Sequence, residues 1–479
     1  MHLDPDSCYR ALEAHDPRFD GKFFVAVSST GIYCRPVCTA RTPRRANCSF
    51  HASAAAAEAQ GYRPCLRCRP ELAPGNAGID ATARLAQAAV DLIENGVPDG
   101  DGMEGVAARI GVTGRHLRRI FAHEFGVTPV AYAQTQRLLL AKRLLTDTTL
   151  PVTEVALASG FASVRRFNTL WKARYRMLPS DLRRRVGAGD AGPARFAFEL
   201  GYRPPYDWDA MLAFLRARAV AGVEHVGADR YRRTLAIEHR GARHVGWIDV
   251  RRLPRKSALE VALSASFARV VPVVLARVKH AFDLACDPTR VAAALGDLAL
   301  ARPGLRVPGA FDGFELAVRA VVGQQVSVAG ARTMLGRLAT ALGEDADTGA
   351  GPEVARLFPT AARVAQCEPA ALARIGLTGA RACTLVALAR AVAAGEITLA
   401  PGVDVDATLE ALMALPGIGS WTAQYVAMRA LGWPDAFPAG DLVVLRALGE
   451  TRPARAIAKS EAWRPWRAYA VMHLWSNAK

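Results

Sequence analysis

The sequence predicts a multidomain protein that is mainly α-helical with α+β parts. Two close cysteine pairs fall near the N-terminus, helical periodicity rich in Ala, Leu and Arg fills residues 79–185 and 306–479, and two strand-like runs, TLAIEHR and ALEVALSAS, lie between these regions. A chain of 479 residues has room for about three or four domains of ordinary size. We therefore expect a small metal-binding domain, a helical domain, a mixed α/β domain and a larger helical domain, over residues 1–78, 79–190, 195–305 and 306–479.

The charge balance favours a nucleic-acid partner. The formal net charge is +17, and Lys and Arg side chains attract the phosphates of a polyanion. An Arg-rich surface without such a partner is the alternative, and charge alone does not separate the two. No apolar run has the length of a membrane span or a signal peptide, and an odd number of cysteines, nine, favours the reducing cytoplasm.

Four cysteines have the spacing of a zinc site. Three residues separate Cys34 from Cys38 and two separate Cys65 from Cys68, so each pair can occupy two corners of a tetrahedral Zn²⁺ site. Most sites of this kind only stabilise a fold. Here seven arginines lie close in sequence, Arg41 among them, and a thiolate beside phosphate-binding cations is also suited to attack an electrophilic methyl group on DNA.

The motifs STGIYCRPVC, NCSFH and GYRPCLRC resemble the methyl-acceptor domain of the Ada family. The resemblance implies that Cys34 accepts a methyl group from a methyl phosphotriester in the DNA backbone, and that Cys34, Cys38, Cys65 and Cys68 hold one Zn²⁺. It also implies that Arg41 contacts phosphate. Methylation would remove one negative charge from the site, and the weaker repulsion would tighten DNA binding by about 1–2 kcal/mol. Nothing obvious restores the thiol, so we expect Cys34 to act once per molecule.

Two helix–turn–helix patterns follow, in residues 105–129 and 152–180. The residues expected to face DNA lie on the second helix of each pattern: Arg115, His116, Arg118, Arg119, Arg165, Arg166 and Asn168. Two such units suit successive major grooves on one face of DNA. A helical bundle with solvated arginines is the alternative for either unit alone, but the pair, with Gly160 and Phe161 before the second recognition helix, resembles the AraC-type DNA-binding domain.

A hairpin signature and a carboxylate lie close together in LPGIGSWTAQYVAMRALGWPDAFPAGD, residues 415–441. Gly417 and Gly419 predict a tight turn whose backbone N–H groups bind a DNA phosphate, often with a monovalent cation. Alone, the turn indicates only non-specific DNA binding or a helix cap. Asp441 follows a Pro/Gly loop, and this combination resembles the helix–hairpin–helix superfamily of base-excision glycosylases. A carboxylate there stabilises the positive charge that develops on the sugar as the N-glycosidic bond breaks.

Further motifs narrow the family. PPYDWDAMLAFLRARAV, ARPGLRVPGAFDGFELAVRAVVGQQVS and RPWRAYAVMHLW resemble the AlkA family of 3-methyladenine glycosylases. The resemblance implies that Trp421, Tyr425 and Trp475 line the base pocket, where electron-rich rings suit a cationic alkylated purine. Trp421 stands where superfamily lyases carry Lys, so we expect a monofunctional hydrolase. Gln325 replaces the family's leucine wedge and Leu442 its tyrosine, which leaves the wedge role and the base preference open.

Together these motifs predict a bifunctional damage sensor, transcriptional activator and DNA repair enzyme that excises bases such as 3-methyladenine. Its expected partners are damaged and promoter double-stranded DNA and RNA polymerase. We expect a monomer in the bacterial cytoplasm, associated with the nucleoid and not with a membrane. One alternative is a regulator whose C-terminal half is a catalytically inactive DNA-binding module. The other is a glycosylase whose N-terminal half only tethers it to DNA through a structural zinc domain.

Overall fold

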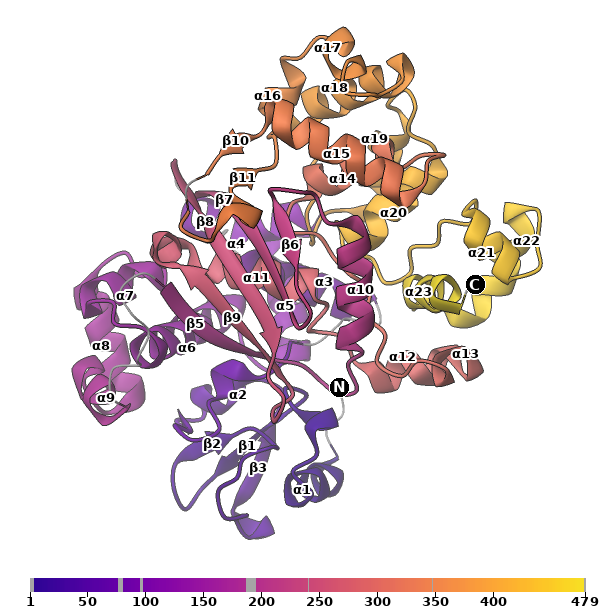
Figure 1. Ribbon diagram of the computed structural model, residues 1–479. Helices are drawn as coiled ribbons and strands as arrows, with labels where there is room; N and C mark the ends of the chain where they lie inside the picture. Colours follow the sequence, from indigo (N-terminus) through magenta and orange to yellow (C-terminus); the bar gives the residue numbers. More distant parts are fainter. Residues whose placement is uncertain are drawn as a thin grey trace.

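The computed structural model describes residues 4–75, 81–94, 98–186, 195–239, 241–346 and 348–477. It is mostly helical with separate sheets, which confirms the expected fold class. In the view of Figure 1, the N-terminal part (4–75) lies at the bottom, a five-stranded sheet crosses the centre, and most C-terminal helices lie above it. The boundary expected at residues 78 and 79 and the segment 187–194 lie outside the described residues. Among the described residues, no helix is long and apolar enough to cross a membrane.

The N-terminal part contains a four-stranded sheet of order β3-β1-β2-β4. Its elements are α1 (Pro5–Glu13), η1 (Pro17–Phe19), β1 (Phe24–Val27), β2 (Ile32–Cys34), η2 (Arg45–Asn47), β3 (Cys48–His51), α2 (Ala54–Ala59), β4 (Arg63–Pro64) and η3 (Pro70–Leu72). Strands β2 and β4 run parallel, with Tyr33 opposite Pro64. Because Cys34 and Cys65 each come directly after these paired residues, the register brings the two cysteine pairs together.

The helical part (81–186) contains both predicted helix–turn–helix units. Its elements are α3 (Ala81–Glu94), α4 (Pro98–Arg109), α5 (Gly114–Phe125), α6 (Pro129–Asp147), α7 (Val152–Ala158), α8 (Val164–Tyr175) and α9 (Pro179–Val186). Helices α5 and α8 begin where the sequence predicts recognition helices. Thr113 and Ser163 cap them, because each hydroxyl oxygen accepts a hydrogen bond from a backbone N–H in the first turn.

The sheet part (195–300) contains a five-stranded antiparallel sheet of order β5-β9-β8-β7-β6. Its elements are β5 (Arg195–Gly201), α10 (Trp208–Arg218), β6 (Glu224–Val226), β7 (Arg230–His239), β8 (Ala242–Arg252), β9 (Ala258–Ser264), η4 (Ala265–Val270), α11 (Val271–Ala281), α12 (Pro288–Leu295) and α13 (Asp297–Leu300). The described residues of the first strand-like run, 234–239, lie in β7, and residues 258–264 of the second run form β9. Alternate residues of β5 and β9 are buried, and they share one apolar core with α6, α8 and α11.

The regular secondary structure of the C-terminal part (301–477) is almost entirely helical, as expected. Its elements are α14 (Gly313–Val322), α15 (Val328–Leu342), β10 (Glu344–Asp345), η5 (Pro352–Val354), β11 (Arg356–Leu357), α16 (Ala361–Ala365), α17 (Pro369–Ala373), α18 (Gly379–Ala393), α19 (Val405–Met413), α20 (Ser420–Arg429), α21 (Leu442–Ala447), α22 (Pro453–Ser460), η6 (Glu461–Trp463) and α23 (Arg467–Asn477). Helices α14, α18, α20 and α23 share a single apolar core. This core holds α20 and α23 in place. These two helices bear the predicted base-pocket residues Trp421, Tyr425 and Trp475.

Buried ion pairs hold the N-terminal part against α6. The Nζ atom of Lys142 lies 2.6 Å from a carboxylate oxygen of Glu71, and both side chains are almost fully buried. Lys142 also donates to the carbonyl oxygen of Cys65 at 3.5 Å. Arg69 pairs with Glu71 at 3.0 Å and with Asp147 at 2.8 Å. Because a buried charge is costly without its partner, these pairs specify how the cysteine-bearing part packs on the helical part.

Candidate functional site

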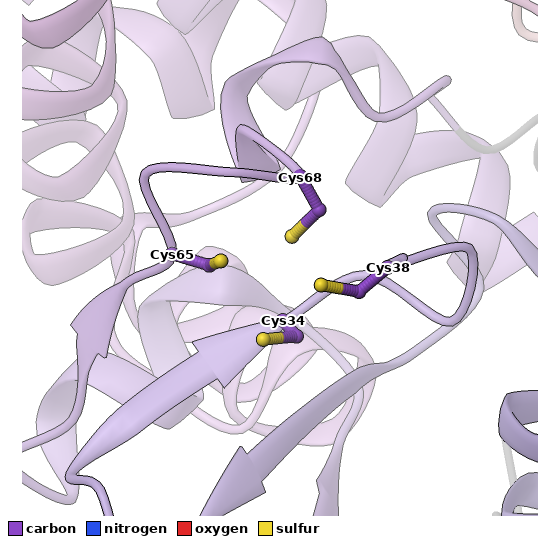
Figure 2. Close-up of side chains that lie close together, drawn as sticks. All are labelled: Cys34, Cys38, Cys65 and Cys68. Atoms are coloured by element: carbon purple, nitrogen blue, oxygen red, sulfur yellow. The ribbon is translucent and has the colours of Figure 1, made fainter. Parts of the chain in front are cut away.

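Four cysteine side chains converge at one end of the N-terminal sheet (Figure 2). Their Sγ atoms all lie within 4.8 Å of one another. A tetrahedral site with metal–sulfur bonds of about 2.3 Å places its sulfurs about 3.8 Å apart, so the cluster fits one zinc ion. Cys38 and Cys65 are buried, whereas Cys34 and Cys68 are only partly buried.

The arginines near this cluster divide into two groups. Arg35 and Arg69 are held in ion pairs, Arg35 with Asp20 and Arg69 with Glu71. The backbone N–H of Arg35 also donates to Cys68 Sγ at 3.3 Å. In contrast, Arg41 is exposed and forms no ion pair with any described residue. Arg35 and Arg69 therefore stabilise the fold through their ion pairs, whereas Arg41 faces solvent.

The predicted recognition residues lie on exposed helix faces. Six are exposed and His116 is half-buried: Arg115, His116, Arg118 and Arg119 on α5, and Arg165, Arg166 and Asn168 on α8. The opposite faces are buried through Phe121 on α5 and Phe167 and Trp171 on α8. Each helix therefore turns its polar face outward while its apolar face supports the fold.

The second site is a cavity of about 1290 Å³ in the C-terminal half. It brings together the residues that the sequence placed in the base pocket, the wedge position and the hairpin: Gln325, Gly417, Gly419, Trp421, Tyr425, Asp441, Leu442 and Trp475. Leu442 is 76% exposed although it is apolar. These residues come from separate segments of the chain. The packing of α20, α21 and α23 places them around one cavity.

Asp441 is held by four hydrogen bonds. It caps α21, where its Oδ1 atom accepts from the backbone N–H groups of Val443 and Val444, each at 3.0 Å. Two indole N–H groups complete the set: Trp475 Nε1 donates to Oδ1 at 3.1 Å and Trp421 Nε1 donates to Oδ2 at 2.9 Å. The carboxylate is therefore fixed in position inside the cavity.

The aromatic side chains of the cavity form a stack beside this carboxylate. The rings of Trp421 and Tyr425 are nearly parallel, with centroids 5.3 Å apart and an interplanar angle of 15°. Trp475 is tilted against Tyr425, with centroids 6.2 Å apart. Trp421 and Tyr425 are four residues apart on α20, so helical spacing places both rings on one face.

The hairpin turn is tied to the segment that carries Gln325. Gly417 has a φ of +83°, and a Cβ atom there would lie 2.1 Å from Thr384 Oγ1, so glycine is required. The Nε2 atom of Gln324 donates to the Gly417 carbonyl at 2.9 Å and to Thr422 Oγ1 at 2.9 Å. Gln325 itself has a φ of +51°, in the left-handed region.

Sequence reasoning missed several residues of this cavity. Gln324 ties the hairpin to the wedge segment, and Arg218 and Arg429 line the cavity behind the aromatic stack. The sequence predicted Trp421 and Trp475 as base-pocket residues and Asp441 as the carboxylate. It did not predict the hydrogen bonds from the two indoles to Asp441. Arg218 lies on α10, far from Asp441 in sequence, so no spacing rule could have identified it.

Four family models match consecutive regions of the chain. They are the metal binding domain of Ada over residues 7–71, a helix-turn-helix domain over 106–185, the AlkA N-terminal domain over 197–312, and the HhH-GPD superfamily of base excision DNA repair proteins over 318–467. The models follow the order of the N-terminal, helical, sheet and C-terminal parts.

Individual proteins are similar over long stretches. A Mycobacterium tuberculosis protein described as a probable bifunctional transcriptional activator/DNA repair enzyme AlkA is 38% identical over 493 residues, covering 100% of this chain and 97% of its own. DNA-3-methyladenine glycosylase 2 of Escherichia coli is 41% identical over 281 residues, 58% of this chain and 96% of its own. The solved 3-methyladenine DNA-glycosylase of Archaeoglobus fulgidus shares the fold, with a TM-score of 0.51 at 19% identity over 58% of this chain and 97% of its own.

Proposed function

This chain belongs to the family of bifunctional transcriptional activators and DNA repair enzymes that combine an Ada-type methyl-acceptor domain with an AlkA-type 3-methyladenine glycosylase, and from that membership we propose which residues carry each activity. Its helix–turn–helix and glycosylase domains make DNA its partner. In this proposal, residues 1–78 accept methyl groups, residues 79–190 bind promoter DNA, and residues 195–305 and 306–479 together form the glycosylase.

Cys34 is the methyl acceptor. With Cys38, Cys65 and Cys68 it would hold one zinc ion, which when bound keeps the sulfurs as thiolates. Cys38 and Cys65 are buried, and Cys68 Sγ already accepts a hydrogen bond from Arg35, which weakens its nucleophilicity. The remaining sulfur, Cys34 Sγ, forms a bond to the methyl carbon as the carbon–oxygen bond of the phosphotriester breaks. The electron pair stays on the phosphate oxygen, which becomes an ordinary phosphodiester anion.

Arg41 positions the phosphate for this transfer. Its side chain is exposed and has no ion-pair partner among the described residues, unlike Arg35 and Arg69. A guanidinium with open donors binds phosphate oxygens well, since it can donate two parallel hydrogen bonds.

Asp441 is the catalytic carboxylate of the glycosylase, and the observation that carries this assignment is its hydrogen bonding by two pocket indoles. A base rotated out of the duplex would enter the cavity and pack against Trp421 and Tyr425. As the C1′–N bond breaks, its electron pair passes to the base and positive charge develops on the sugar. The Asp441 carboxylate, fixed by four donors, stabilises that charge while water attacks C1′.

Trp475→Phe is expected to lower the rate of 3-methyladenine release by about tenfold. Phenylalanine keeps an aromatic ring but removes the N–H that donates to Asp441, and a hydrogen bond to a charged group contributes about 1.5–3 kcal/mol. The rate is measured in a single turnover on methylated DNA. Trp433→Phe is the matched control, because Trp433 packs against the core outside this cavity. Equal rates for the wild type and Trp475→Phe would contradict the role of the indole.

One preparation of DNA treated with a methylating agent tests both activities together. The wild-type protein should release 3-methyladenine and should itself gain a single methyl group. Release without methyl gain would leave a tethered glycosylase, and methyl gain without release would leave a regulator with an inactive C-terminal module.

The exposed recognition helices support a more specific proposal about binding partners. We propose that the DNA-bound protein is a monomer that engages RNA polymerase at bacterial promoters in the nucleoid. At the hairpin, the turn around Gly417 and Gly419 would bind a DNA phosphate together with a monovalent cation. The base opposite the excised nucleotide would meet Gln325, which with Leu442 lies on the lining of the same cavity.

A further inference from the structure

The loop that ends at Asp441 is anchored to the start of α23 by a buried ion pair. Asp435 lies in this loop, residues 430–441 between α20 and α21, and Arg467 is the first residue of α23. Arg467 Nε donates to Asp435 Oδ1 at 2.7 Å, and its Nη2 atom donates to Oδ2 at 3.0 Å and to the Asp435 carbonyl at 2.9 Å. Each side chain is only 8% exposed. The planar guanidinium therefore holds one residue of the loop through three hydrogen bonds.

Backbone hydrogen bonds strengthen this anchor on both sides of Asp435. The N–H of Ala468, the second residue of α23, donates to the Pro434 carbonyl at 2.9 Å. The N–H of Phe437 donates to Gln424 Oε1 at 3.0 Å. Because Gln424 lies on α20, the loop is tied to both helices that bear the base-pocket residues.

A catalytic hydrogen bond joins the two segments that leave this anchor. Asp441 follows Asp435 by six residues of loop, and Trp475 follows Arg467 by eight residues of helix, a rise of about 12 Å. Helices α21 and α23 lie side by side (Figure 1). Trp475 Nε1 donates to Asp441 Oδ1 at 3.1 Å. The length of this hydrogen bond therefore depends on how the loop is fixed to α23.

We propose that the Asp435–Arg467 pair positions Asp441 for catalysis, because it sets the separation between the loop and α23 at which the Trp475 indole donates to the carboxylate. This inference rests on the proposed function, in which Asp441 stabilises the cation on the sugar. Asp435 and Arg467 lie outside the lining of the Asp441 cavity, so the pair acts through the residues it holds and not by contact with the base. A hydrogen bond weakens steeply once its length and angle are lost.

Positioning and a long-range effect of charge predict different results for Arg467→Lys. Lysine keeps the positive charge beside Asp435, but its single ammonium group cannot hold two carboxylate oxygens in parallel. If only the charge of the pair acted on the cavity, Arg467→Lys would release 3-methyladenine at the wild-type rate. Positioning predicts slower release, because the loop can then shift relative to α23.

The test measures whether the pair acts through the Trp475 hydrogen bond. Release of 3-methyladenine from methylated DNA is followed in single turnover, with protein in excess, for Asp435→Asn and Arg467→Lys, each alone and combined with Trp475→Phe. Either change alone should slow release by about tenfold, the effect of losing one hydrogen bond to a charged group. In Trp475→Phe protein the same change should slow release by no more than about twofold, because the hydrogen bond that the pair positions is already absent.

Affinity for the methylated DNA separates this role from a general loss of structure. Binding should stay within about twofold of the wild type, since the pair lies outside the cavity that receives the base. Arg467→Lys is the milder change and decides the question if Asp435→Asn does not fold.

Glu71→Gln is the matched control. Glu71 is also a buried carboxylate in an ion pair, with Lys142 at 2.6 Å, but it belongs to the N-terminal part. This variant should melt at a lower temperature and yet release 3-methyladenine at the wild-type rate, with or without Trp475→Phe added to both proteins.

Three results would overturn the inference and leave the proposed function intact. They are undiminished release by Asp435→Asn, release at the wild-type rate by Arg467→Lys, and equal slowing by either change in the wild-type and Trp475→Phe proteins. A wild-type protein that releases no 3-methyladenine would overturn both the inference and the glycosylase assignment.

Discussion

Asp441→Asn is expected to lower the rate of 3-methyladenine release by about 10²–10³-fold. Asparagine has the same shape and its oxygen can still accept the N–H groups of Val443 and Val444, so α21 keeps its cap. What is lost is the negative charge that faces the developing cation on the sugar, together with the hydrogen bond from Trp421 Nε1, which an amide NH2 group at the Oδ2 position cannot accept. The effect should therefore lie in the rate of bond breaking and not in DNA binding, which a single-turnover assay at saturating protein separates.

Asp404→Asn is the control for this substitution. Asp404 caps α19 in the same way, through a hydrogen bond from the backbone N–H of Ala407 at 3.1 Å, but it lies outside the cavity of Asp441. Its release rate should stay within about twofold of the wild type, as for a change far from the chemistry. Undiminished release by Asp441→Asn would remove this carboxylate from the mechanism and revive the reading of the C-terminal half as an inactive DNA-binding module.

Cys34→Ala is expected to abolish methyl uptake from methylated DNA. Alanine has no sulfur to form the new bond, and the other three cysteines are buried or already hydrogen-bonded. Release of 3-methyladenine should persist, because Asp441 and its cavity belong to the other half of the chain. Methyl uptake is measured as the mass gained by the whole protein.

Cys48→Ala is the matched control in the same part of the chain. Cys48 is partly buried like Cys34, but its thiol donates to the Arg44 carbonyl at 3.4 Å and lies outside the four-cysteine cluster. This variant should gain one methyl group like the wild type. A methyl group on Cys34→Ala protein would show that a different atom accepts it.

Local patterns predicted the parts of this molecule that depend on neighbours in sequence. The spacing of Cys34, Cys38, Cys65 and Cys68 predicted a cluster, and the structure places their sulfurs together. Two helix–turn–helix patterns predicted helices that bear Arg115 and Arg165, and these residues lie on α5 and α8. The strands of the N-terminal sheet are only two to four residues long, too short to show an alternating pattern, so that sheet was not foreseen.

Contacts between distant segments could not be predicted from one sequence. Trp475 lies 34 residues from Asp441, and Lys142 lies 71 residues from Glu71, so their pairing depends on how whole helices pack. The two arginines behind Tyr425 come from α10 and α20, which belong to different parts of the fold. Sequence motifs therefore identified the reactive side chains. The structure was needed to show which charged and hydrogen-bonding residues surround them.

The most direct test of the account follows Cys34 and DNA affinity in the same sample. The wild-type protein is incubated with DNA that carries methyl phosphotriesters, the adduct is mapped by peptide mass, and the affinity for unmodified DNA is measured before and after at fixed salt. We expect one methyl group, on Cys34, and binding to unmodified DNA about 5–30-fold tighter, the equivalent of about 1–2 kcal/mol. A protein that gains no methyl group at Cys34, or gains it with unchanged affinity, would contradict the account.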